Sequence, residues 1–139
     1  MMQRYDLPYV GCLVGVAFQR MLKDLEKELE KQQLPISGPE YMILRALFAK
    51  NGASQSDVVE MVGKDKSSIC RSIKSLASRG LVRVEQVSYK LNRIWLSEEA
   101  EKIKPRIMEV AATRHEDLAS RLSDDGLKLF VEMLNKIIE

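Results

Sequence analysis

The stretch KDKSSICRSIKSLASRGLVR, residues 64–83, decides how the rest of the chain is interpreted. Asp65 is a suitable helix N-cap and Gly80 a suitable helix stop, so residues 66–78 are predicted to form a helix. Its apolar residues share one narrow face at helical spacing: Ile69, Ile73 and Leu76. The opposite face has no acidic residue and consists of Ser67, Arg71, Lys74 and Ser78. The pattern predicts one buried face and one polar face turned outward.

The polar face has the composition of a helix that reads DNA. The major groove of B-form DNA admits one α-helix, and its base edges offer hydrogen-bond donors and acceptors. Arg71 can donate two hydrogen bonds to guanine, whereas Lys66 and Lys74 suit phosphates as compact charges on flexible stems. A face rich in serine and lysine can also be merely solvated. The short helix predicted before it and the tight turn Gly63–Asp65 favour a helix-turn-helix.

The segments upstream carry local signals for two further helices. Ser37 and Glu40 form a predicted capping box at the start of a helix that ends near residue 50. Ser54 begins a short helix, and Gly63 is placed to end it in the left-handed conformation. These two helices precede the polar helix in the order that a helix-turn-helix requires.

Downstream the pattern changes to that of a small sheet and then back to helices. Residues 81–87 and 92–96 are predicted strands, joined by a turn over residues 88–91. Ser97 begins the next helix, in which Pro105 is expected to cause a bend. A last helix begins at residue 123.

The first and last helices are more apolar than one small domain needs. A helix over residues 8–33 would be about 40 Å long, and one stripe on it carries Val14, Phe18, Met21, Leu25 and Leu29. The C-terminal helix crowds apolar side chains toward the chain end, from Leu127 to Ile138. These apolar surfaces predict that another surface covers them, such as that of a second subunit.

The composition is that of one ordinary globular domain. The 139 residues are 45% hydrophobic and 30% charged, which excludes a multidomain enzyme, a collagen-like fibre and a disulfide-stapled miniprotein. Cys12 and Cys70 lie 58 positions apart and His115 is the only histidine, so no metal site is expected. The chain has neither a phosphate-binding glycine loop nor an H-E-x-x-H motif, so neither enzymatic activity nor a cofactor is expected.

The net charge of +2 hides an uneven distribution. Residues 64–93 contain eight basic and two acidic residues, a net charge of +6, so the remainder carries −4. A basic region in an otherwise acidic chain is typical of a nucleic-acid contact surface, although a solvated helix face would have the same composition.

Three stretches resemble the MarR family of bacterial transcription regulators. Residues 36–44 are similar to the second-helix signature of that family, residues 65–82 to its recognition helix and wing entry, and residues 96–100 to its wing exit. The resemblance covers nearly the whole chain in the right order. It implies a mainly α fold with a small β-wing, in which a winged helix-turn-helix lobe is joined to N- and C-terminal dimerisation helices. We therefore expect a single domain over residues 1–139, with the lobe at 34–97 and the dimerisation helices at 7–33 and 98–139.

The resemblance further implies a homodimer that binds double-stranded operator DNA and is released by a small-molecule effector or an oxidant, as a repressor would be. The residues expected at the DNA are Ser54, Gln55, Lys64, Lys66, Ser67, Ser68, Arg71, Lys74, Lys90 and Arg93. One departure concerns the wing. The family usually braces it with an Asp-x-Arg pair, whereas no aspartate occurs between Gln86 and Ser97, so the bracing of this wing is open.

The effector has two candidate sites. Cys12 resembles the peroxide-sensing cysteine of the OhrR branch of the family, and its hydroxyl partners could be Tyr5, Tyr9 or Tyr89. Cys12 could equally be a small buried hydrophobe. A small molecule would instead bind between the dimerisation helices and the lobe, near residues that could also be plain core: Leu13, Ala17, Met42, Ile107 or Ala111.

A winged helix that binds only protein, without DNA-binding activity, is the alternative function. The acid-free polar face favours DNA, because a protein-binding wing has no need to keep it. The apolar run Val10–Phe18 is nine residues long, lacks a signal-peptide cleavage site and is too short to span a bilayer. A cytoplasmic location without membrane contact is therefore expected.

Overall fold

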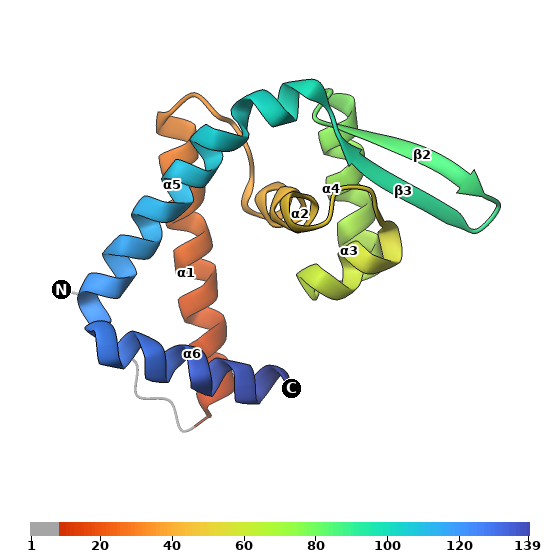
Figure 1. Ribbon diagram of the computed structural model, residues 1–139. Helices are drawn as coiled ribbons and strands as arrows, with labels where there is room; N and C mark the ends of the chain where they lie inside the picture. Colours follow the sequence, from red (N-terminus) through yellow and green to blue (C-terminus); the bar gives the residue numbers. More distant parts are fainter. Residues whose placement is uncertain (1–8) are drawn as a thin grey trace.

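Six α-helices and three short strands make up residues 9–139, the part of the chain that the computed structural model describes (Figure 1). The elements in chain order are α1 (Val10–Lys31), α2 (Gly38–Ala49), β1 (Ala53–Ser54), α3 (Gln55–Val62), α4 (Lys66–Ser78), β2 (Val82–Ser88), β3 (Leu91–Leu96), α5 (Glu98–Leu122) and α6 (Asp124–Ile138). The expected fold class, mainly α with a small β-wing, is confirmed.

The start of α2 is held by two carboxylates. Ser37 Oγ accepts a hydrogen bond from the Glu40 backbone N–H at 3.2 Å, and Glu40 Oε1 accepts one from Ser37 N–H at 2.9 Å, so the predicted capping box is confirmed. Glu26 on α1 accepts a further bond from Gly38 N–H at 2.6 Å. A Cβ at residue 38 would lie 2.7 Å from Leu22 Cγ, so glycine allows α1 to approach this helix end closely.

The turn between α3 and α4 follows the local chemistry of its sequence. Ser54 Oγ caps α3 by accepting from Asp57 N–H at 3.1 Å. Gly63 ends α3 with a φ of 77°, the left-handed conformation that a side chain disfavours. Asp65 Oδ2 then caps α4 by accepting from Ser68 N–H at 2.9 Å. The predicted bounds of α4 are confirmed.

The wing is a three-stranded antiparallel sheet with the order β1-β3-β2. Ile94 in β3 pairs with Val84 in β2 and with Ala53 in β1. The two-residue strand β1 was not predicted from the sequence, and it ties the wing to the start of α3. The register of β2 and β3 shifts between Gln86 and Ser88, so Val87 forms a bulge near the tip.

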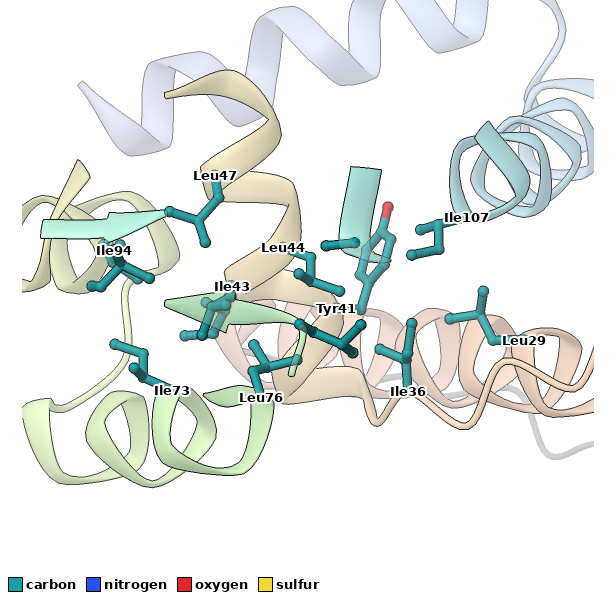
Figure 2. Close-up of a cluster of buried hydrophobic side chains, with 14 of the residues drawn as sticks. Leu29, Ile36, Tyr41, Ile43, Leu44, Leu47, Ile73, Leu76, Ile94 and Ile107 are labelled. Carbon is teal, nitrogen blue, oxygen red and sulfur yellow. The ribbon is translucent and has the colours of Figure 1, made fainter. Parts of the chain in front are cut away.

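The hydrophobic core is centred on α2 (Figure 2). Ile43, Leu44 and Leu47 are fully buried, and they meet side chains from the surrounding elements: Leu29 of α1, Leu76 of α4, Ile94 of β3 and Ile107 of α5. Burying one such side chain contributes about 1.5–3 kcal/mol. This cluster therefore fixes α4 and the base of the wing to the same central helix.

Helices α1, α5 and α6 form a separate arm beside the winged lobe (Figure 1). α5 is continuous through Pro105 and changes direction early in its course, in agreement with the predicted bend. α6 follows α5, against which it packs, and has no buried residue in the single chain (Figure 1). None of the helices between residues 9 and 139 is long and apolar enough to cross a lipid bilayer.

Candidate nucleic-acid interface

The two faces of α4 are oriented as the sequence predicts. Ile69, Ile73 and Leu76 are buried, with 2%, 5% and 0% of their surface exposed. The opposite face is exposed along its whole length, at Ser67, Arg71, Lys74 and Ser78. Because the apolar face is anchored in the core, the acid-free polar face has to point outward.

The first turn of α4 holds Arg71 in a short hydrogen-bonded chain. Ser68 Oγ donates to Asp65 Oδ1 at 2.7 Å, and Arg71 Nη2 donates to Ser68 Oγ at 3.2 Å. The Ser68 hydroxyl, followed by the Ser68 backbone N–H, lowers the pKa of Asp65, so this carboxylate is ionised at neutral pH. The Ser68 hydroxyl, an expected DNA contact, is therefore engaged in capping, whereas Arg71 is held by one long hydrogen bond that it can exchange for a base.

A polar hollow of about 350 Å³ lies between the start of α3, the start of α4 and the wing. It brings together four of the expected DNA contacts: Ser54, Gln55, Lys66 and Lys90. Its lining contains no acidic residue, and the positive end of α3 opens into it. A phosphate group therefore fits its charge.

This hollow is also lined by polar residues that were not predicted from the sequence as DNA contacts: Ser56, Gln86, Tyr89 and Asn92. The alternation of β2 and β3 indicates which wing residues share a face, but nothing local indicates that this face meets α3. That contact depends on the pairing of β1 with β3.

Lys64 lies in a different hollow. A depression of about 250 Å³ runs along the other side of α4, where Lys64 and Arg71 flank an apolar floor that includes Leu22, Met42 and Ile69. Lys64 and Arg71 thus line a hollow at one edge of α4, and Lys66 and Lys90 line the hollow between the other edge and the wing.

The wing is braced without the aspartate of the family pattern. Arg93 Nη1 donates to the carbonyl of Gly52 at 3.0 Å, and Asn51 Oδ1 accepts from Leu96 N–H at 2.9 Å. Arg93 is half-buried and is directed to the base of the wing. The tip consists of Tyr89, which is 93% exposed, and the exposed Lys90.

Cys12 lies in the first turn of α1, where its thiol is free and exposed. It is therefore not a buried hydrophobe within one chain. Among its expected partners, Tyr5 lies outside the described residues and Tyr9 is exposed. Tyr89 belongs to the β2–β3 turn, which Figure 1 places at the opposite end of the molecule from the start of α1. The sensor role of Cys12 stays a prediction.

A third cavity, of about 300 Å³, lies between α1, α2 and α5. Met42 and Ala111 line it, as expected for a small-molecule site, whereas Leu13 and Ala17 do not, and Ile107 is fully buried core. Its apolar wall includes Phe18, Met21 and Leu25, and Arg114 and His115 lie on α5 beside it. The guanidinium Nε of Arg114 is buried and has no hydrogen-bond partner among residues 9–139.

A short helix, a tight turn, a helix with an anchored apolar face and a following β-hairpin define a winged helix-turn-helix protein. A family model described as the MarR family matches residues 34–88. The transcriptional regulator HosA of Escherichia coli O157:H7 is 29% identical over 111 residues, which cover 78% of this chain and 82% of HosA. These matches confirm the MarR-family resemblance of the sequence.

Solved structures share the fold at low sequence identity. A MarR transcriptional regulator from Methanosarcina mazei Go1 superposes with a TM-score of 0.82 at 20% identity, over 96% of this chain and 90% of that one. The DNA binding of Bordetella bronchiseptica BpsR is regulated by 6-hydroxynicotinic acid. BpsR superposes with a TM-score of 0.79 at 20% identity, over 98% of this chain and 99% of BpsR. Streptomyces coelicolor PcaV, solved with its natural ligand, superposes with a TM-score of 0.77 at 22% identity, over 99% of this chain and 97% of PcaV. These relatives and neighbours are transcription regulators, not enzymes.

Proposed function

We propose that this chain is a sequence-specific regulator that binds double-stranded operator DNA as a homodimer and represses transcription until an effector releases it. The observation that carries the proposal is the exposed, acid-free face of α4, set directly opposite the residues that anchor the helix in the core. A cationic hollow at each edge of α4 continues this surface toward the DNA backbone.

The acidic residues of the basic region lie outside the polar face of α4. Asp65 is engaged at the start of α4 as its N-cap, and Glu85 lies on the wing 3.8 Å from Arg83. The polar face of α4 carries no carboxylate of its own, and the charge of Asp65 acts on Arg71 from the start of the helix. Phosphate contacts supply affinity, and Arg71 supplies base preference.

A second copy of the chain accounts for the exposed apolar side chains of α1 and α6. Val14 and Phe18 on α1 and Phe130, Met133 and Ile137 on α6 are all exposed in the single chain. Burial of these faces in a two-fold dimer would assign residues 7–33 and 98–139 to dimerisation and leave residues 34–97 as the DNA-binding lobe. The two α4 helices would then enter successive major grooves about one helical turn apart.

The cavity between α1, α2 and α5 is the site we propose for a small-molecule effector. It lies where the arm meets the lobe, so a ligand there can alter their relative position. Burial raises the pKa of the Tyr41 hydroxyl, and the charge of Arg45 offsets only part of this rise. The hydroxyl therefore stays protonated at neutral pH and can donate a hydrogen bond. Arg114 and Arg121 line the cavity together with Asp24 and Asp117, so its lining offers both positive and negative charge to an effector. Release through oxidation of Cys12 is the alternative.

Selection of bound sequences from random duplexes, followed by titration of the recovered duplex at several salt concentrations, tests the proposal. A dimer with six or more phosphate contacts should lose about 1000-fold in affinity between 50 and 200 mM salt. Recovery of one palindromic sequence supports an operator-binding dimer. Failure to retain any duplex at low salt would favour the alternative of a winged helix that binds only protein.

A further inference from the structure

The C-terminal end of α4 is held by one buried carboxylate. Among the residues that the structure describes, Glu40 is the one charged residue that is buried, with 5% of its surface exposed. Its Oε2 accepts from Ser75 Oγ at 2.9 Å and from Arg79 Nη1 at 2.8 Å, and its Oε1 accepts from Arg79 Nη1 at 2.9 Å. One side chain of α2 thus binds two side chains at the end of α4.

Arg79 extends this connection to the segment that precedes α2. It is the C-cap residue of α4, and its Nη2 donates to the carbonyl of Pro35 while Nη1 contacts Glu40. The guanidinium therefore links the end of α4 to both sides of the capping box of α2. This is a planar, multiply hydrogen-bonded contact, which a lysine ammonium could not reproduce.

The position of these contacts on α4 restricts rotation of the helix about its own axis. At 100° per residue from Ile69, Ser75 lies at about −120° and Arg79 at about −80°. They thus lie on one flank, between the apolar stripe and the polar stripe. The core side chains limit rotation of α4 through close packing, and the hydrogen bonds on this flank add a directional restraint that a small rotation would strain.

Building on the proposed DNA-binding function, we propose that Glu40 and Arg79 are positioning residues for DNA recognition, which fix the rotation of α4 and with it the direction in which Arg71 extends. Side chains of an α-helix reach about 5–6 Å from its axis, so a rotation of α4 by about 20° displaces the end of the Arg71 side chain by about 2 Å. That displacement far exceeds the width of the range of hydrogen-bond distances, about 2.7–3.2 Å, and removes a bidentate contact with guanine.

The electrostatics of the contact agree with this role. Burial raises the pKa of Glu40, but hydrogen bonds from the Ser37 backbone and from the hydroxyls of Ser75 and Ser37, together with the charge of Arg79, outweigh burial and lower it. Glu40 is therefore ionised at neutral pH, and the contact with Arg79 is a charged one.

Two substitutions test the proposal in the chain of residues 1–139. Glu40→Gln keeps the size of the side chain and one acceptor for Ser37 N–H, but removes the charge that Arg79 contacts. Arg79→Met keeps the apolar stem of a partly exposed side chain and removes all of its donors. Each variant should bind the duplex recovered from wild-type selection at least about 30-fold more weakly, the lower bound for losing one bidentate base contact in each protomer of the dimer. Affinity for a scrambled duplex and the salt dependence should stay at the wild-type values.

Two controls separate positioning from general destabilisation. Glu99→Gln makes the same chemical change in an exposed pair with Lys102 on α5, at 3.4 Å, and should leave both affinities unchanged. Ile107→Val weakens the core away from α4 and shows whether lost stability alone reduces sequence preference. Arg79→Lys should recover only part of the specific affinity, because it restores the charge without the planar donors.

The outcomes are distinguishable. A loss confined to the selected duplex in Glu40→Gln and Arg79→Met supports the positioning role. Wild-type discrimination in both variants, or an equal loss on both duplexes, overturns it while the proposed function stands. A wild-type protein that prefers no sequence overturns the proposed function itself, and the positioning role with it.

Discussion

Truncation of Arg71 to alanine should abolish most of the sequence preference of the protein without unfolding it. Arg71 is exposed on α4, and its contact with the Ser68 hydroxyl, at 3.2 Å, is long and solvent-accessible. An exposed side chain with one such bond contributes within about 0.5 kcal/mol to the free energy of unfolding. We therefore expect the melting temperature of Arg71→Ala to match that of wild type closely.

The expected loss in binding is much larger than the loss in stability. A bidentate contact between arginine and guanine contributes about 1–3 kcal/mol of discrimination. A two-fold dimer carries the change twice, so the loss is about 2–6 kcal/mol, or roughly 30-fold at the lower limit. Affinity for a scrambled duplex should fall far less, because one cation among several phosphate contacts is removed from each protomer.

Fluorescence anisotropy with the selected duplex and a scrambled duplex, at several salt concentrations, measures both effects. Lys66→Ala is the matched comparison, since Lys66 lines the polar hollow beside the wing and is expected at a phosphate. It should weaken both duplexes alike and reduce the slope of log K against log salt by about one for each protomer. If Arg71→Ala kept the wild-type ratio between the two duplexes, the assignment of Arg71 as the base-reading residue would be wrong.

Three further predictions concern stability and assembly. Gly52→Ala should lower the free energy of unfolding by more than about 1–2 kcal/mol, the cost of a left-handed residue, because φ is 82° and the new Cβ would lie 2.5 Å from the Trp95 ring. The control in thermal unfolding is Gly63→Ala, where φ is 77° but no atom lies within 4 Å of the added Cβ. An equal loss of stability in both variants would show that the contact with the Trp95 ring adds nothing. Because the pKa of Glu40 is lowered from its ordinary value of 4.5, its ionised form stabilises the fold above that pH, and this contribution is lost as pH falls through the folded pKa. The free energies of unfolding of wild type and Glu40→Gln, measured in urea, should therefore differ at neutral pH and converge in acid. A difference that stays constant as the pH falls would refute the stabilising role of the ionised Glu40. Ile137→Asp, at a position 65% exposed in the single chain, should shift the protein from dimer to monomer in sedimentation, whereas an unchanged dimer would place the interface elsewhere.

The helix boundaries could be predicted because their causes are local. The hydroxyls of Ser37 and Ser54 and the carboxylate of Asp65 each accept from a backbone N–H three residues on, and this needs only the right residue at the right spacing. Gly63 adopts a conformation that few other residues tolerate. The orientation of α4 was likewise predictable, since one turn of a helix determines which side chains share a face.

The parts of the site that involve distant segments could not be predicted in this way. The strand β1 has two residues and no pattern of its own, and it exists because β3 offers an edge to pair with. The hollow between α3 and the wing follows from that pairing, and so does the contact between Arg93 and the carbonyl of Gly52. A sequence pattern records which residue types are present, whereas these contacts depend on how far apart the folded elements lie.

The missing aspartate of the wing is explained by these same contacts. Arg93 donates to Gly52, and Gly52 lies against the indole ring of Trp95, two residues along β3 from Arg93. A glycine at residue 52 thus admits the ring and positions the carbonyl that Arg93 binds, so one backbone turn holds the base of the wing from two sides. Arg93 would have to give up its bond to the Gly52 carbonyl to reach into a minor groove, and its DNA contact stays a prediction. We therefore predict that Lys90, which lies at the exposed tip and also lines the polar hollow, supplies the cationic contact of the wing with DNA.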